Sequence, residues 1–331
     1  MTPPSDPAAQ HTSQAHFERR WGALRNARVR ALAWLLDAPG LLDGTDPSWQ
    51  GKVLRLGDVT PDVERWLFAL DHDPAALDAA LGERAYTRLG LYAEKLMAFY
   101  FRAQGSLVAH GLQVRATRND TVGEFDFLLD AGPDGVEHIE LATKFYLLHR
   151  HDPANLDTLV GPNLADSLGA KMRKIVERQL ILGEHPAAQA LLARPVVRAR
   201  ALVKGWLFYP LEGRAGAGTD IDDVATARHA IRGIDPDHCR GFWCPIGELD
   251  WLPGASFAIL PKLQWLAPYR TDDPDRILTR AALQVALSAQ FNISDSPILV
   301  ALLQPEADHT IESARGFIVP PTWRSRAAAL P

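Results

Sequence analysis

The chain contains only two cysteines, Cys239 and Cys244, among its 331 residues. Small secreted domains that depend on disulfides are rich in cysteine, so that class is excluded and a reducing compartment is expected. No segment reaches the run of ~20 apolar residues that a membrane helix needs. The first residues also lack the charged start and apolar stretch of a secretory signal. The sequence therefore predicts a soluble cytoplasmic protein without a membrane partner.

Positive charge is not in excess, because 35 Lys and Arg residues stand against 40 Asp and Glu residues, a net charge of −5. A protein coated in basic residues is excluded, whereas a local basic groove is compatible with this balance. Hydrophobic residues make up 47% of the chain, which is enough for a large core. A length of 331 residues allows ~2 domains or one elaborated domain.

Composition and periodicity divide the chain into four parts. Residues 1–14 are rich in Pro, Ser and Gln and are expected to form a disordered tail. Residues 15–83 form a helical N-terminal region, in which apolar residues keep helical spacing over 15–36. Residues 84–212 are predicted to form an α/β core. Residues 213–331 are predicted to form an α/β extension packed on that core.

The core has a distinct order of elements. The patterns predict a helix over 84–104, strands over 112–118, 122–130 and 136–148, a helix over 164–182 and a strand over 198–211. Gly105 is expected to end the first helix. The segment Gly-Pro-Asp-Gly at 132–135 is typical of a tight turn between two antiparallel strands.

Acidic residues lie on two neighbouring strands of this core. Side chains alternate between the faces of a strand. Glu124 and Asp126 should therefore share a face of the second strand, with Phe125 on the other, and Glu140 and Lys144 should share a face of the third. Burying carboxylates costs several kcal/mol per ion unless a partner compensates them. A magnesium ion, which prefers oxygen ligands, together with a lysine would provide that compensation.

These residues carry a resemblance to known proteins. VGEFDFLLD followed by HIELATK resembles the PD-(D/E)XK nuclease superfamily. The longer segments GEFDFLL, ELATKFYL, RGFW and LPKLQWLAP resemble a bacterial, uncharacterised family, domain of unknown function 1853. The resemblance implies a restriction-endonuclease-like core and hydrolysis of phosphodiester bonds in nucleic acid. It also implies dependence on Mg²⁺ or Mn²⁺, with DNA favoured over RNA as the partner.

The resemblance assigns the acidic residues to a metal site. Asp126 corresponds to the aspartate of the motif, and Glu140 to its second carboxylate. Both would be catalytic and bind the metal. Glu94, in the preceding helix, matches an additional ligand of many superfamily members. Glu124 occupies the acidic position of the G-E-x-D variant and is a possible additional site residue.

The lysine departs from the superfamily pattern. The motif expects it two residues after Glu140, where this chain has Ala142, and Lys144 follows two residues later. That shift keeps the same face and moves the Cα by about 6.5 Å. The resemblance therefore implies that Lys144 is the catalytic lysine, displaced. Lys171, Lys174 and Gln179 on the next helix are possible additional site residues that would border the cleft and contact phosphates.

Other interpretations of the same residues stay open. The charged residues of the strands are also compatible with cross-strand pairs on a solvated face, each contributing about 0.2–1 kcal/mol. The basic helix residues are compatible with a solvated surface. A non-catalytic descendant of the fold that binds nucleic acid or a protein is favoured by the displaced lysine. A structural or interaction protein without a nucleic-acid role is favoured by the net charge of −5.

Overall fold

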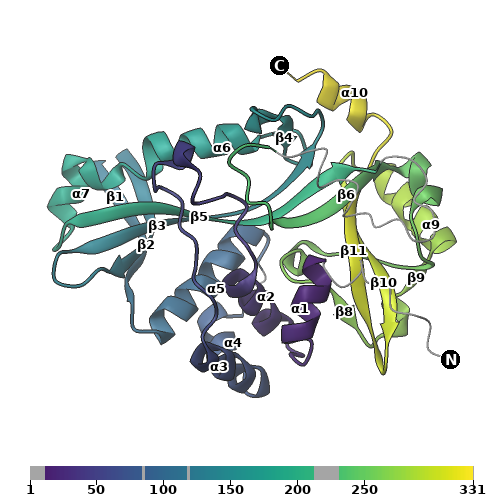
Figure 1. The fold of residues 1–331 in the computed structure, drawn as a ribbon, viewed down its shortest axis with the longest axis horizontal. Helices are drawn as coiled ribbons and strands as arrows, with labels where there is room; N and C mark the ends of the chain where they lie inside the picture. Colours follow the sequence, from purple (N-terminus) through teal and green to yellow (C-terminus); the bar gives the residue numbers. More distant parts are fainter. Residues whose placement is uncertain (1–11, 84–85, 118–119, 212–230, 331) are drawn as a thin grey trace.

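A large mixed sheet runs through the protein in the computed structural model (Figure 1). The structure describes residues 12–83, 86–117, 120–211 and 231–330. Within them the strand order is β1-β2-β3-β5-β6-β11-β10-β7-β9, with β4 beside β3 and β8 beside β11. The strands are β1 (Leu107–Thr117), β2 (Asp120–Asp130), β3 (Val136–Leu148), β4 (Leu159–Val160), β5 (Val196–Pro210), β6 (Cys239–Pro245), β7 (Ser256–Ile259), β8 (Arg270–Thr271), β9 (Leu278–Thr279), β10 (Ile298–Glu306) and β11 (His309–Val319).

Helices lie on both sides of the sheet, with α5 and α2 on one side of its central strands and α6 on the other (Figure 1). They are α1 (Ser13–Trp21), α2 (Ala27–Asp37), α3 (Pro61–His72), α4 (Ala75–Leu81), α5 (Leu89–Ala103), α6 (Leu168–Lys174), α7 (Pro186–Leu191), α9 (Arg280–Phe291) and α10 (Trp323–Ala328). No helix in these described parts is both long and apolar enough to cross a membrane.

The N-terminal region differs from the prediction in two places. The single helical pattern over 15–36 forms two helices, α1 and α2. The break has a local cause, since Asn26 begins the second helix by accepting hydrogen bonds from the amides of Arg28 and Val29. The tail predicted over 1–14 lies outside the described residues as far as residue 11, and α1 already begins at Ser13.

The central part of the chain follows the predicted order. After α5, strands β1, β2 and β3 form an antiparallel meander, and β5 returns after α6 to pair in parallel with β3. The turn at 132–135 joins β2 to β3, with Asp130 opposite Val136. Gly105 follows α5 with φ +71°, a conformation that suits glycine at a helix end. These core predictions are confirmed as an α/β arrangement.

Side chains of β3 alternate between two hydrophobic clusters, as predicted. Ile139 and Phe145 belong to the cluster on the side of α5, whereas Ala142 and Tyr146 belong to the cluster on the side of α6. On β2 the prediction is wrong for Phe125. Its ring packs edge-on against His138, at a centroid distance of 4.8 Å, on the even-numbered face of β3.

Phe127 keeps the predicted face in the α5 cluster. The alternation of β2 therefore breaks at Asp126, between these two phenylalanines. The break coincides with the end of the ladder between β2 and β3, which runs from Asp130↔Val136 only to Phe127↔Ile139. Beyond this point β2 does not pair with β3, so pairing with β3 no longer determines which face the side chains of β2 occupy.

The sheet continues across the boundary expected at residue 212. β5 pairs with β6, and β6 pairs with β11, so the core and the C-terminal extension share one sheet. β11 has no clear strand pattern in the sequence, because Glu312 and Arg315 interrupt its apolar residues. Both residues are nevertheless fully buried.

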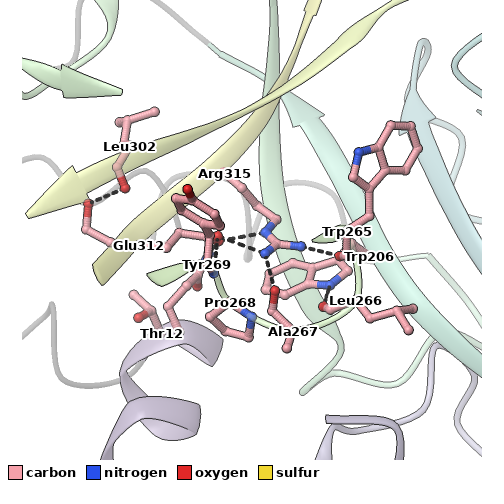
Figure 2. A network of polar contacts seen from close by, with 12 residues as sticks. Thr12, Trp206, Trp265, Leu266, Ala267, Pro268, Tyr269, Leu302, Glu312 and Arg315 are labelled. Atoms are coloured by element: carbon pink, nitrogen blue, oxygen red, sulfur yellow. Dashed lines mark hydrogen bonds and ion pairs between the residues drawn. The ribbon is translucent and has the colours of Figure 1, made fainter. Parts of the chain in front are cut away.

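Glu312 and Arg315 form the centre of a buried polar network (Figure 2). Arg315 Nε donates to Glu312 Oε1 at 2.6 Å, and the guanidinium lies 4.2 Å from the centroid of the Trp206 ring. Glu312 also accepts hydrogen bonds from the Tyr269 amide at 2.9 Å and from Gln14 Nε2 at 3.0 Å. Arg315 donates further to backbone carbonyls of the segment 265–267. The network therefore ties α1, β5 and this loop to β11.

The substitution Glu312→Gln is expected to lower the free energy of unfolding by about 3 kcal/mol. It retains the shape of the side chain but leaves the Arg315 charge buried without a counter-ion. Urea denaturation provides the measurement, with Asp62→Asn at an exposed ion pair as the control that should leave stability unchanged. A Glu312→Gln variant as stable as the wild type would show that the network does not support the fold.

Candidate functional site

The site lies where β2 and β3 separate. In a continued ladder the Leu141 amide would meet a carbonyl of β2, but here it donates to Asp126 Oδ2 at 2.9 Å. The Asp126 carboxylate thus takes the place of a backbone acceptor at the opening between the strands. Glu140 follows Ile139, the last residue of β3 that pairs with β2, so the two carboxylates flank the opening.

Glu140 is buried, with 2% of its surface exposed. Its Oε1 accepts a hydrogen bond from Gln179 Nε2 and lies 3.9 Å from Lys171 Nζ. Its Oε2 is also buried but finds no hydrogen-bond partner among the described residues. His138 Nε2 lies 3.8 Å from that oxygen. One carboxylate oxygen of the site is therefore available to a ligand.

The two carboxylates disfavour each other's charge. Burial raises the pKa of Asp126, and the nearby Glu94 charge raises it further. Burial also raises the pKa of Glu140, and the Asp126 charge is the second cause. Lys171 opposes both shifts. Ionising both carboxyl groups therefore requires more positive charge than Lys171 supplies, and a bound cation would provide it.

Glu94 reaches the opening from α5, on the opposite side of the sheet from α6. Its Oε1 lies 2.7 Å from Nε2 of His110 on β1, and the His110 ring stacks on Phe127. These contacts fix the Glu94 side chain beside the sheet. The structure thus brings Glu94 into the electrostatic surroundings of both Asp126 and Glu140.

Lys171 and Gln179 meet because the helix that carries them contains a π-turn over residues 175–179. In a regular α-helix, eight residues of separation turn two side chains ~80° apart, because each residue adds ~100°. The wider turn absorbs one extra residue, which reduces that difference to ~20°. Lys171 Nζ accordingly donates to Gln179 Oε1 at 3.2 Å, and both side chains contact Glu140.

Lys144 lies elsewhere than the resemblance implies. It shares a strand face with Glu140, but its Nζ donates to Asp166 Oδ2 at 2.8 Å. Tyr146 donates to the same oxygen at 3.1 Å. The lysine is therefore engaged by an aspartate of the loop before α6, and Lys171 is the lysine that the structure brings to Glu140.

The remaining predicted residues lie at the margin of the site. Glu124 is exposed and accepts a hydrogen bond from Gln113 at 3.4 Å, although its charge contributes to the raised pKa of Asp126. Lys174 is exposed. Burial lowers the pKa of Lys171 most, and the charges of Lys144 and then Lys174 lower it further. Both side chains therefore lie at the edge of the site, where they are exposed to solvent.

Two histidines and one aspartate around the site are not predicted from the sequence. His110 and His138 contact or approach Glu94 and Glu140, and Asp166 holds Lys144. Burial lowers the pKa of His138 to about 4, so its ring is neutral near pH 7. The sequence signal for His138 is its spacing. It lies two residues before Glu140 on β3, which places both side chains on the same face of the strand.

The donor set suits a hard cation. Within the part of the chain that the structure describes, no three His, Cys, Asp or Glu side chains are grouped as a ready-made metal site. Magnesium is commonly bound through one or two carboxylates, while water and substrate oxygens complete its coordination. Asp126 and Glu140, with the unpartnered Oε2 of Glu140, meet that smaller requirement.

Comparison with family models matches residues 30–319 to the domain of unknown function DUF1853. The matched segment contains every residue of the site described above. The chain belongs to the DUF1853 family. Neither the curated proteins nor the solved structures include a match to it.

The raised pKa values predict how the stability of this DUF1853 protein depends on pH when no metal is present. A carboxyl group with a raised folded-state pKa stabilises the fold below its unfolded pKa, and that contribution is lost as pH rises through the folded pKa. The chelator-treated wild type should therefore lose stability between about pH 5 and pH 8. Glu140→Gln should lose less, because its side chain does not ionise.

Thermal unfolding of both proteins across this range in EDTA measures the difference. The difference between the melting temperatures of Glu140→Gln and the wild type should widen as the pH rises. Parallel curves would contradict the inferred burial of an unfavourable charge at Glu140.

Proposed function

We propose that this DUF1853 protein is a divalent-metal-dependent nuclease that hydrolyses phosphodiester bonds in nucleic acid, with DNA favoured over RNA. The observation that carries the proposal is the pair Asp126 and Glu140. They are carboxylates of adjacent strands at the point where the strands separate, one of them with an unpartnered buried oxygen. The element order α5, β1-β2-β3, α6, β5 is the order that a restriction-endonuclease-like core would have. It supports membership of the PD-(D/E)XK superfamily.

Asp126 and Glu140 would hold Mg²⁺ or Mn²⁺, and Glu94 would assist from α5. When bound, such an ion activates water and stabilises charge on a phosphate. The fit rests on oxygen donors, on the unpartnered Glu140 Oε2 and on the negative charge that both carboxyl groups would carry in their ionised forms, which burial disfavours without a cation. Lys171 compensates only part of this charge, and a divalent cation would compensate the rest.

The side chains of α6 and of the π-turn that follows it supply the other functions that hydrolysis needs. Gln179 donates to Glu140 Oε1 and fixes the orientation of that carboxylate. Lys171 places a cation beside the same oxygen, where it would stabilise the negative charge that develops on the phosphate. Lys174 is exposed on the same helix and would contact a neighbouring phosphate without reading sequence. We assign the charge-stabilising role to Lys171 rather than to Lys144 on this geometry.

A cleavage assay tests the proposal. Labelled single-stranded and double-stranded DNA and RNA are incubated with the full chain in Mg²⁺ or Mn²⁺, and in EDTA. Cleavage in metal that ceases in EDTA is expected, with DNA cleaved faster than RNA. Absence of cleavage of all four substrates under ample metal would oppose the enzymatic function.

A non-catalytic nucleic-acid-binding or protein-interaction module is the second candidate. The ion pair of Lys144 with Asp166 favours it, because the lysine of the strand motif is withdrawn from the carboxylates. Such a module would bind nucleic acid or a protein partner and leave the nucleic acid intact. The same assay, combined with a gel-shift measurement, distinguishes binding alone from cleavage.

A further inference from the structure

A cavity of about 630 Å³ lies on the α1 and α2 side of the sheet, away from α6. Its walls come from α1, the end of α2, residues 54–58, β5 and the start of β6. Apolar walls are provided by Phe17, Trp34, Leu54 and Leu202. Binding sites for small molecules commonly have volumes of ~300–1,000 Å³ and mostly apolar walls. The cavity is therefore of a size that would accept a small organic ligand.

Lys204 is the most deeply buried of the charged side chains that line this cavity. Only 3% of its surface is exposed. Its ammonium group can donate three hydrogen bonds, yet among the described residues it donates to one acceptor, the carbonyl of Ala38. No carboxylate of the described residues forms an ion pair with it, although Asp37 and Asp235 act on it from a distance.

A buried ammonium without a counter-ion is unfavourable, because the loss of hydration is not repaid. Burial accordingly lowers the pKa of Lys204 to about 8. Of the two aspartates, Asp37 is already held by Arg20 at 2.6 Å and by the Trp21 indole at 2.8 Å. An anion entering the cavity would supply both the missing charge and the missing acceptors.

Basic and acidic side chains both line the cavity. Arg55 and Arg240 line it together with Lys204, and so do Asp37 and the exposed Asp58 and Asp237. Arg55 makes only long ion pairs with Asp43 and Asp235, at 3.8 and 3.6 Å, and Arg240 donates to the Pro236 carbonyl. Neither guanidinium has a close bidentate carboxylate partner among the described residues. Both can therefore contribute to the attraction of an anion.

We infer that this cavity is a binding site for a small organic anion whose carboxylate or phosphate contacts Lys204 and whose apolar body packs against Phe17 and Trp34. The site is separate from the carboxylates of the proposed nuclease centre. Lys204 projects from β5 on the same side as Trp206, which belongs to the cluster on the side of α5. Ala201, which lies opposite Glu140, belongs to the cluster on the side of α6. Its occupancy is therefore measurable independently of cleavage.

Isothermal titration calorimetry of the full chain tests the inference. The ligands are phenyl phosphate, benzoate and the neutral analogue benzyl alcohol. At least one of the two anions should bind saturably and ~10-fold or more tightly than benzyl alcohol, a difference of about 1.4 kcal/mol. Tighter binding of phenyl phosphate would indicate a phosphate ligand, and tighter binding of benzoate would indicate a carboxylate ligand.

Lys204→Met keeps the apolar stem and removes the charge. It should lose the preference for the anions while still binding benzyl alcohol, and it should be at least as stable as the wild type without ligand. Lys204→Gln provides a second variant if the methionine protein does not fold. Lys262→Met, at an exposed lysine outside the cavity, is the matched control and should bind like the wild type.

Asp126→Asn should also bind the anions like the wild type, since it lies at the other site. Failure of both anions to bind, equal binding of benzyl alcohol, or unchanged anion affinity in Lys204→Met would each overturn the inference.

Discussion

Asp126→Asn is expected to reduce metal-dependent cleavage of DNA at least ~10³-fold, because the substitution removes a charged ligand from the proposed metal site. The asparagine carbonyl can still accept the hydrogen bond that the Leu141 amide donates to Asp126 Oδ2. The opening between β2 and β3 should therefore keep its shape. Stability without metal should be unchanged or slightly higher, because one of two mutually repelling carboxylates is lost. Initial rates of cleavage and thermal unfolding in EDTA measure the two effects.

Asparagine is more informative than alanine at this position. Asp126→Ala would remove the acceptor of the Leu141 amide as well as the charge, so a loss of activity could result from local distortion. Asp130→Asn is a matched control on the same strand, where an exposed carboxylate pairs with Arg194. That control should cleave like the wild type. Equal activity of Asp126→Asn and the wild type would assign the cleavage to another site or another protein.

Lys171→Met is expected to reduce the cleavage rate by ~10²–10³-fold, the loss that follows removal of one preorganised group that stabilises developing charge. The lysine is the cation nearest Glu140, at 3.9 Å from Oε1, and it donates to Gln179. Methionine retains the apolar stem, which limits changes in packing. Single-turnover rates at saturating DNA measure this loss without a contribution from weaker binding.

Lys144→Met is the informative comparison. Its ammonium is held by Asp166 at 2.8 Å, so its removal should reduce the rate by less than ~10-fold. The opposite order of effects, with Lys144→Met inactive and Lys171→Met active, would restore the displaced lysine of the strand motif to the catalytic role. Full activity of both variants would remove lysine from the mechanism.

The order of the core elements could be predicted from the sequence because each has a strong local pattern. The alternation of β3, the Gly-Pro-Asp-Gly turn and the glycine after α5 depend on neighbours in the sequence, and the structure confirms them. The same periodicity placed Glu140 and Lys144 on one face. Motif resemblance then pointed to the residues that the structure places around the opening of the sheet, Asp126, Glu140 and Glu94.

The other features depend on contacts between distant parts of the chain. Phe125 turns to the face of His138 because β2 leaves its partner strand, which no local pattern records. The π-turn that aligns Lys171 with Gln179 inserts one residue into an otherwise regular helical period. β11 is buried with its charged residues because Glu312 and Arg315 compensate each other within the fold. Polar partners such as Asp166 come from loops whose course is not encoded in periodicity.

Anomalous diffraction from crystals soaked in Mn²⁺ tests the central claim most directly. The metal site proposed for this DUF1853 protein predicts an anomalous peak in contact with the carboxylate oxygens of Asp126 and Glu140, including the Oε2 that lacks a partner. The peak should disappear in Asp126→Asn crystals soaked in the same way. Density for Mn²⁺ at other positions only, or at none under ample metal, would contradict the account.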